Sequence, residues 1–298
     1  MLRRTPDRPD RDLRKISLLV ACLAVSFGSA ATAADMTAPL LPPPATATYD
    51  WSGCYAGLNA GGIFSAEQYS LAMAGGFLLN NNLFSNPANN SQVGHSFASH
   101  ASSFTGGGQV GCNRQIGILV FGFEADFDHA GQSSSTAHFG PAGPIIGAND
   151  PARNHVSSQT DSVGQNGDWY STVRGRIGLT ATPTLLLYAT GGLAVARISS
   201  AANVTFGADR FFLSNNMFAG SHSETRNGWT VGAGSEWAFL PNWSLRAEYL
   251  YLDFGSFSYA LACTAPSCSG APTIPYAWSA HVKSADHVFR VGLNYTFH

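Results

Sequence analysis

The chain has 298 residues, a formal net charge of −2 and only 11% charged residues, and glycine occurs 32 times. This length allows one large β domain or two ordinary domains, and the low, balanced charge excludes a nucleic-acid-binding protein with a basic face. Mean hydropathy is +0.00. No apolar run of about 18 residues follows the N-terminal region, which argues against transmembrane helices but does not test for a barrel of alternating strands.

The N-terminus has the order of an export signal. Basic residues are frequent up to Lys15, residues 16–27 (ISLLVACLAVSF) form a short apolar run, and residues 31–33 (ATA) provide a small-x-small cleavage site. This pattern predicts a signal peptide over residues 1–33, and therefore export from the cytoplasm.

Two further features lie beside the expected cleavage site. The stretch 19-LVAC-22 fits a lipobox, so lipidation of Cys22 is the alternative export signal. Residues 34–50 are rich in Pro, Ala and Thr, which predicts an extended leader before a single domain over residues 51–298.

Alternating apolar and polar residues recur in eight segments after the leader, each about ten residues long, the length that a tilted strand needs to cross a bilayer. In chain order the segments cover residues 54–64, 104–113, 119–128, 169–180, 185–197, 228–239, 244–254 and 286–297.

The connections between these segments alternate between short and long. Short turns are expected at 114–118, 181–184 and 240–242, and long loops are expected at 65–103, 129–168, 198–227 and 255–285. This alternation is typical of an outer-membrane barrel, with short periplasmic turns and long external loops. The sequence therefore predicts an all-β fold, an eight-stranded antiparallel up-and-down transmembrane barrel with four long external loops.

Parity along the segments separates an apolar face from a charged one, because successive strand side chains point to opposite sides. In 119–127 the odd positions are apolar, whereas Glu124 and Asp126 occupy even positions. A solvated face of a half-buried sheet is the alternative, but such a face is usually rich in Lys, Thr and Gln. We expect an ion-pair network inside a narrow lumen, formed by Glu124, Asp126, Glu236, Glu248, Arg174, Arg176, Arg246 and Arg290.

The hairpin around residues 240–242 has two plausible registers. One places Glu236 opposite Arg246, and a slip places Glu236 opposite Glu248. Like charges directly opposite each other are destabilising, so the first register is predicted. Aromatic side chains near segment ends are expected to form interfacial girdles; they are Trp51, Tyr55, Trp169, Trp237, Trp243, Tyr295 and Phe297.

Several stretches resemble the porin-like small outer-membrane β-barrel family of α-proteobacteria, whose architecture is similar to the OmpA transmembrane domain. They include 51-WSGCYAGLNAGG-62, 173-VRGRIG-178, 241-PNWSLRAEYLYLDFG-255 and 290-RVGLNYTF-297. The resemblance implies outer-membrane lipid around the barrel, insertion by the assembly machinery through the C-terminal strand, and a mainly structural or surface-interaction role. The family usually ends in an aromatic residue, whereas here His298 follows Phe297.

Four cysteines follow the signal, as expected for an exported chain with disulfides. Cys54 and Cys112 stand where the family usually has aromatic residues, on the lipid-facing parity at the periplasmic ends of neighbouring strands. A cross-strand disulfide and two independent small apolar residues are both compatible with that position. Cys263 and Cys268 are expected to form a local disulfide in the last external loop.

The main functional prediction is an outer-membrane barrel with a structural or surface-display role and a lumen filled by the charge network. The alternatives are a small-solute porin and a surface receptor for haem, metal or a host ligand, whose binding would use loop histidines among His95, His100, His129, His138, His155, His222 and His281. Motifs of serine hydrolases, zinc proteases and phosphate-binding loops are absent, so neither catalysis nor a cofactor is expected.

Overall fold

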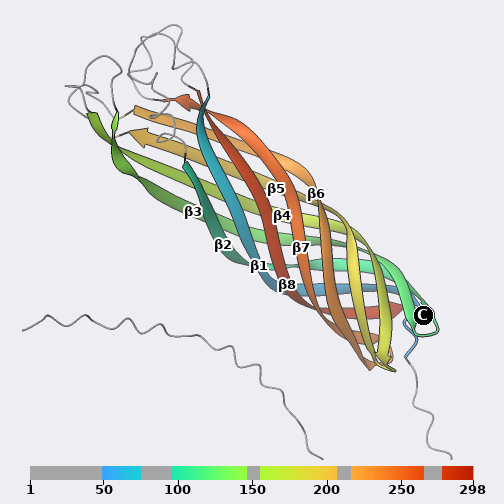
Figure 1. The fold of residues 1–298 in the computed structure, drawn as a ribbon. Helices are drawn as coiled ribbons and strands as arrows, with labels where there is room; N and C mark the ends of the chain where they lie inside the picture. The colour runs from blue at the N-terminus through green and yellow to red at the C-terminus, as the bar shows by residue number, and fades with distance from the viewer. Residues whose placement is uncertain (1–48, 75–94, 146–154, 207–215, 265–276, 298) are drawn as a thin grey trace, which may run out of the picture. The chain divides into compact units, whose positions relative to one another are not determined.

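The computed structural model describes residues 49–74, 95–145, 155–206, 216–264 and 277–297. These residues form eight β-strands joined in sequence order, and pairing of the first strand with the last closes the barrel (Figure 1). The strands are β1 (Gly53–Ala74), β2 (His95–Ile116), β3 (Leu119–Ile145), β4 (His155–Thr182), β5 (Leu185–Phe206), β6 (Asn216–Leu240), β7 (Trp243–Cys263) and β8 (Ala277–Phe297). All pairings are antiparallel, which confirms the predicted fold class. No helix in the described ranges is long and apolar enough to cross a membrane.

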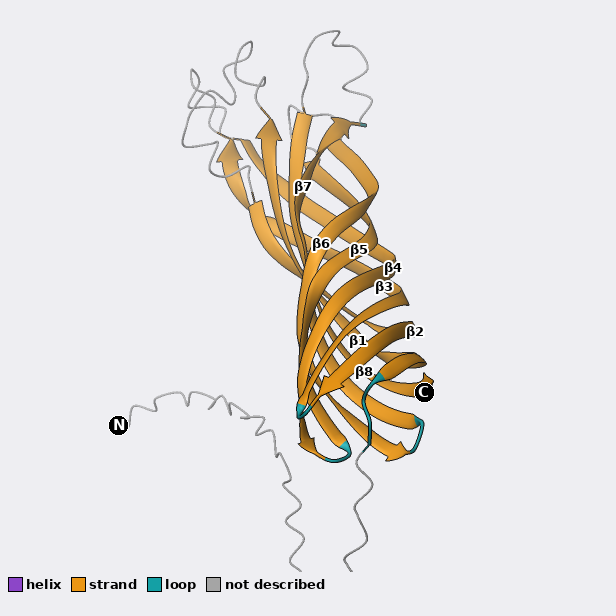
Figure 2. Ribbon diagram, turned by 90° about the vertical axis from the view of Figure 1, so that its right-hand side faces the viewer, coloured by secondary structure: helices purple, strands orange, loops and turns teal. Residues whose placement is uncertain are grey.

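Three two-residue turns lie together at one end of the barrel (Figure 2). They fall at residues 117–118, 183–184 and 241–242, inside the three short connections that the sequence predicts. Gly117 has a φ of +62°, a left-handed conformation that glycine adopts without steric cost. Pro183 and Pro241 begin the other two turns. Proline has no amide proton, and at these positions its absence removes no hydrogen bond between strands.

The strands are much longer than the alternating segments in the sequence indicate. Their lengths run from 21 residues in β7 to 28 in β4, so strands extend well into all four expected loops, at 65–103, 129–168, 198–227 and 255–285. These stretches are rich in Ser, Ala, Asn and Gly, a composition that suggests loops but also suits a strand with a polar outer side. The connections that remain lie outside the described residues.

Each strand passes through two sections of the barrel with opposite chemistry. In the lower section, next to the two-residue turns, apolar side chains such as Leu58, Phe123 and Val291 are 73%, 61% and 57% exposed on the outside. We define this section as residues 53–64, 104–116, 119–128, 169–182, 185–195, 229–240, 243–251 and 289–297. The upper section is the remainder of the strands.

In the upper section most large apolar side chains point inward, and Phe139 on β3 is an exposed exception. Leu71, Leu261 and Trp278 are fully buried there, while Gln68 and Lys283 lie exposed on the outer side of neighbouring strands. Because apolar surface turns away from water, this inversion indicates that the lower section is surrounded by an apolar medium and the upper one by water.

The ladder between neighbouring strands is interrupted at two places in the upper section. Described pairs between β2 and β3 stop at Gly106 and His129, and the two strands diverge above that point (Figure 1). Between β6 and β7 no described pair joins Ala219–Ala262 to Trp229–Asp253. We call these interruptions the β2–β3 seam and the β6–β7 seam.

The two seams divide the upper section into two four-stranded sheets, one of β3 to β6 and one of β7, β8, β1 and β2. Side chains bridge the seams where backbone pairs are missing. Ser103 Oγ donates to the Gly131 carbonyl at 2.8 Å, and Arg226 donates to the carbonyls of Phe254 and Ser256 at 3.1 and 3.0 Å. The apolar core therefore lies between two sheets that face each other, as in a β-sandwich.

Candidate functional site

The lumen of the lower section is filled by charged side chains. Arg174 on β4 pairs with Glu124 on β3, with Asp126 at 2.7 Å and with Glu248 on β7 at 3.0 Å. The Arg174 side chain is 0% exposed and its three partners are nearly as buried. One guanidinium thus joins strands on opposite sides of the barrel, which a planar fork with five donors can do.

The other three arginines complete the same network. Arg290 lies 2.7 Å from Asp126 and 2.8 Å from Glu248, and Arg176 lies 2.8 Å from Glu236. Arg246 pairs with Glu124. The structure brings all eight predicted lumen residues together.

The network also includes residues that were not among the eight predicted ones, in particular one acid and two tyrosines. Asp128 accepts a hydrogen bond from Arg290 at 2.9 Å. The network therefore contains five acids, one more than predicted, and four arginines. Tyr55 links Arg176 at 3.0 Å to Glu124, and Tyr188 donates to Glu248 at 3.0 Å. The alternation of side chains along a strand indicates that two of these residues face the lumen. Asp128 lies on the same face as Glu124, and Tyr55 is next to the lipid-facing Cys54 and therefore points to the opposite side.

The predicted register of the β6–β7 hairpin is confirmed, although the two facing side chains form their ion pairs with other residues. Glu236 stands opposite Arg246 in the ladder. Yet Arg246 pairs with Glu124, and Glu236 pairs with Arg176. Both side chains point into a narrow lumen, so the strand across the barrel offers a partner as close as the neighbouring strand does.

Glycines make room for the tyrosines of this network. A Cβ atom on Gly111 would lie 2.5 Å from the Tyr55 hydroxyl, and one on Gly234 would lie 2.5 Å from the Tyr188 hydroxyl. Any larger residue at either position would force the ring out of the lumen.

The lower mouth of the lumen is sealed by residues that precede β1. Trp51 is 3% exposed and packs in one cluster with Val120, Leu186 and Ala238. Its amide donates to the Gln115 side chain at 2.9 Å, and the Tyr49 hydroxyl donates to Thr296 at 3.2 Å. The expected girdle role is therefore wrong for Trp51, as it is for Tyr55.

The remaining expected girdle residues lie on the outer surface. Trp237, Phe297, Trp243 and Tyr295 are 51%, 57%, 37% and 37% exposed, and Trp169 is half-buried beside Phe127. Their rings lie near both borders of the lower section, where the amphipathic rings of an interfacial belt are found.

The upper section contains one polar layer inside its apolar core. Glu67 on β1 and Asp286 on β8 point inward, and burial raises the pKa of Glu67 to about 7 and that of Asp286 to about 6. Hydroxyl and amide side chains surround them, among them Ser65, Gln132 and Ser134. Among the described residues, the donors to these two acids are uncharged, unlike those of the arginine-rich lower lumen.

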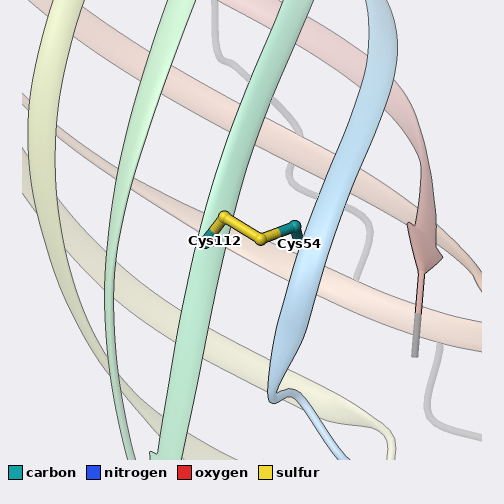
Figure 3. The surroundings of a disulfide bond; sticks show 2 residues. All are labelled: Cys54 and Cys112. Carbon is teal, nitrogen blue, oxygen red and sulfur yellow. A yellow bond between two sulfur atoms is a disulfide. The ribbon is translucent and has the colours of Figure 1, made fainter.

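Cys54 and Cys112 form a disulfide on the outer face of the lower section (Figure 3). The two residues stand directly opposite each other in the β1–β2 ladder. Of the two arrangements compatible with the sequence, the structure therefore has the cross-strand bond. Cys263 is the last residue of β7 and Cys268 lies outside the described residues, so the expected Cys263–Cys268 bond stays a prediction.

The histidines considered for ligand binding lie on strands rather than in loops. His95 contacts Asp161 at 2.8 Å near the upper mouth, and His222 lies 3.3 Å from Glu224 at the β6–β7 seam. His100, His129 and His281 are exposed on the outer side of the upper section. Within the described ranges no group of three or more His, Cys, Asp or Glu side chains is placed to hold a metal ion.

Comparison with known proteins gives one family and several relatives. The family model described as outer membrane protein beta-barrel domain matches residues 20–297. The 31 kDa outer-membrane immunogenic protein of Brucella melitensis biotype 1 is 33% identical over 285 residues, which cover 94% of this chain and 99% of that protein. The 22 kDa outer membrane protein of Rhizobium leguminosarum bv. viciae is 29% identical over 55% of this chain and 60% of its own length. Among solved structures, OprG from Pseudomonas aeruginosa matches with a TM-score of 0.41 and 12% identity, over 84% of this chain and 99% of that one.

Proposed function

This chain belongs to the outer membrane protein beta-barrel domain family and lies in the outer membrane, and we propose that it is a closed barrel that displays a rigid stalk outside the cell. The α-proteobacterial relatives confirm the resemblance found in the sequence. The observation that carries the proposal is the filled lumen: three successive layers of side chains occupy it from the lower mouth to the upper section.

Each layer opposes the passage of solutes for its own reason. At the lower mouth, Trp51 and its apolar neighbours exclude water. In the lower lumen every described acid is paired with an arginine and therefore held in place, and an eight-stranded barrel has room only for side chains or one small ligand. In the upper section the apolar core fills the space between the sheets. These layers favour a structural barrel over the small-solute porin.

The upper section supports the display role. In β1 it runs from Ser65 to Ala74, which at the rise of a strand extends on the order of 20 Å or more beyond the apolar belt. Its outer side carries mainly Ser, Thr, His and Ala, and Phe139 is a large apolar residue exposed there. The Brucella relative has the word immunogenic in its name, which supports an exposed surface for this chain as well.

The same surfaces support the proposed partners. The apolar outer side of the lower section fits outer-membrane lipid, and the terminal strand β8, which ends in Tyr295, Thr296 and Phe297, fits insertion by the assembly machinery. A ligand of the upper surface remains a proposal without a defined site, and no catalytic role is proposed.

Planar-bilayer recording of the refolded chain tests the closed lumen. We expect no conductance steps above lipid leakage, with a general porin as positive control for the assay. Heat-modifiable gel mobility of the same sample establishes that the barrel is folded. Discrete ohmic steps from folded, wild-type protein would contradict the proposal and favour the porin.

Labelling of intact cells tests the display role. Ser135 lies exposed on the outer side of upper β3, and Ser235 lies half-buried on the outer side of lower β6. A membrane-impermeant maleimide should label S135C and leave S235C unlabelled, with the wild-type chain as background control. Equal labelling of the two variants would place both residues in the same medium and overturn the display role.

A further inference from the structure

Every described acid of the lower lumen is paired with an arginine, whereas two acids of the upper section have no such partner. Glu67 and Asp286 are 2% and 6% exposed, yet no cationic side chain pairs with either of them in the part of the chain that the structure describes. Burying a carboxylate without a counter-charge is costly, so this arrangement needs a source of positive charge or a proton.

The two carboxyl groups are close neighbours on the inner face of one sheet. Glu67 stands opposite Ser284 in the β1–β8 ladder, and Ser65 stands opposite Asp286, so the acids occupy diagonal positions. Diagonal positions on an antiparallel pair are about 7–8 Å apart, a distance that two carboxylate side chains can close onto a shared ion.

The groups around the acids are neutral oxygen and amide groups. Tyr69 and Ser134 donate to Glu67 at 3.2 and 3.4 Å, and Ser65 donates to Asp286 at 2.5 Å. Ser65 in turn accepts a hydrogen bond from the Gln132 amide at 2.6 Å. Their hydroxyl oxygens keep lone pairs that an ion can use.

Gln165 provides a second, independent indication of a ligand. It lies on β4 in the facing sheet, is 4% exposed, and donates through Nε2 to Ser284 at 3.2 Å. Its Oε1 atom is buried and has no hydrogen-bond partner within the described residues. Because Ser284 stands opposite Glu67 and two residues from Asp286, the unpaired amide oxygen belongs to the same layer as the two carboxylates.

We propose that Glu67, Asp286 and Gln165 form a binding site for a divalent cation of the Ca²⁺ type, inside the upper section of the barrel. Two carboxylates and one divalent ion are electrically neutral together, which removes the cost of the buried charges. An oxygen-only set of ligands suits Ca²⁺ or Mg²⁺ rather than zinc or copper, which use nitrogen and sulfur. The mixture of carboxylate, amide and hydroxyl oxygens on four strands (β1, β3, β4 and β8) favours the flexible coordination of Ca²⁺ over the strict octahedron of Mg²⁺.

The β2–β3 seam gives this site a route to water. Ser65 and Glu67 pair across β1–β2 with Ala101 and Ser99, both beyond the last β2–β3 backbone pair. Only side chains bridge the seam at this level, such as Ser99 and Thr136 at 2.8 Å. An ion can therefore enter by rotation of a few side chains, without opening a strand ladder.

The ion would join the two sheets of the upper section. Glu67 and Asp286 belong to the sheet of β7, β8, β1 and β2, whereas Gln165 belongs to the sheet of β3 to β6. Binding should therefore stiffen the stalk at the level where the two seams weaken it. This role is independent of lumen closure, so a conducting barrel would leave the cation site untouched.

Terbium luminescence tests the site directly, because Tb³⁺ replaces Ca²⁺ and Tyr69 contacts Glu67 closely enough to sensitise it. The full chain is refolded in EDTA, exchanged into metal-free buffer and titrated with Tb³⁺. We expect saturable emission at one ion per chain, displaced by Ca²⁺. Emission that is absent, or that Ca²⁺ fails to displace, would mean that protons neutralise the pair and would overturn the proposal.

Substitutions assign the emission to these residues. E67Q and D286N keep the side-chain volumes and should each weaken Tb³⁺ binding by at least about tenfold, and Q165L, which keeps both carboxylates, should weaken it severalfold. D253N is the matched control, since Asp253 lies on the outer side of β7, and it should bind as wild type does. Each variant is compared only when its heat-modifiable mobility shows a folded barrel. Wild-type affinity in every folded variant of the three ligands would refute the assignment.

Discussion

The lower and upper sections of this barrel are formed by the same eight strands but bury opposite kinds of side chain. Charged side chains fill the interior of the lower section, and apolar side chains fill that of the upper one. Within β8, Val291 and Leu293 point outward in the lower section while Arg290 points into the lumen. Eight residues earlier, Val282 points inward and Lys283 points outward. The backbone alternation continues through the strand, so the change reflects the surroundings: lipid outside the lower section and water outside the upper one.

The two interiors also differ in how they treat charge. In the lower lumen four arginines pair with five acids, whereas the upper layer holds Glu67 and Asp286 among hydroxyl and amide groups. Ladders are continuous around the lower section and interrupted at two seams above it. The lower section is therefore fixed by backbone pairs and ion pairs together, and the upper one mainly by packing between two sheets.

Removal of one arginine should break the lower section most severely. Arg174→Met leaves Glu124, Asp126 and Glu248 short of a buried counter-charge, which should destabilise the folded barrel by about 3 to 5 kcal/mol. Denaturant unfolding in detergent micelles measures the loss. Arg197→Met is the control, because its pair with Asp168 is 3.7 Å long and both side chains are more than half exposed, so it should cost less than about 1 kcal/mol. Equal losses would mean that the lumen pairs contribute no more than a surface pair.

Truncation of a leucine in each section tests the inversion itself. Leu261 is 0% exposed in the upper core, so Leu261→Ala should cost about 3 kcal/mol through lost burial and a cavity. Leu293 is 41% exposed on the outer side of the lower section, and Leu293→Ala should cost less than about 1 kcal/mol once the barrel is in lipid. Unfolding from lipid vesicles gives both values. The reverse order would contradict the assignment of lipid to the lower surface.

Loss of the disulfide should have a moderate effect confined to the lower section. The bond closes a sequence separation of 58 residues, so the C54S/C112S double variant should be less stable by at least about 2 kcal/mol, because the unfolded chain gains freedom. Reductant should lower the wild-type stability by a similar amount and leave the variant unchanged. If reductant has no effect on wild-type unfolding, the bond contributes nothing measurable.

The smallest expected effect concerns pH at the β6–β7 seam. The hydrogen bond from Arg226 lowers the pKa of Glu224 below its usual value. A carboxyl whose pKa is lowered in the folded state adds stability above its unfolded pKa near 4.5, and this stability is lost as pH falls through the folded pKa. Because the Glu224 side chain is 36% exposed, E224Q should cost well under about 1 kcal/mol at neutral pH and nothing in acid. Unfolding curves of both proteins across this range check it, and a larger cost in acid than at neutral pH would contradict the assignment.

Particular residues show where prediction from the sequence ends. Glu236 and Arg246 were placed in the correct register because like charges exclude the alternative, a local argument that needs only one hairpin. Their true partners, Arg176 and Glu124, lie on strands across the lumen, and no local pattern identifies them. Trp51 was assigned to an interface from its ring alone, and only the closed barrel shows that it seals a mouth.

The sequence by itself determined the number of strands, their antiparallel order, the side on which the residues of five lower strands point and the membrane in which the barrel lies. Those properties follow from the two-residue alternation of apolar and polar side chains, from turn residues and from similarity to relatives. All three can be recognised in the sequence without the structure. Only the tertiary structure decided how far the strands continue, where the two seams open and which charges meet. These depend on distances between residues such as Gln165 and Ser284, which are remote in sequence and form a hydrogen bond only when the barrel closes.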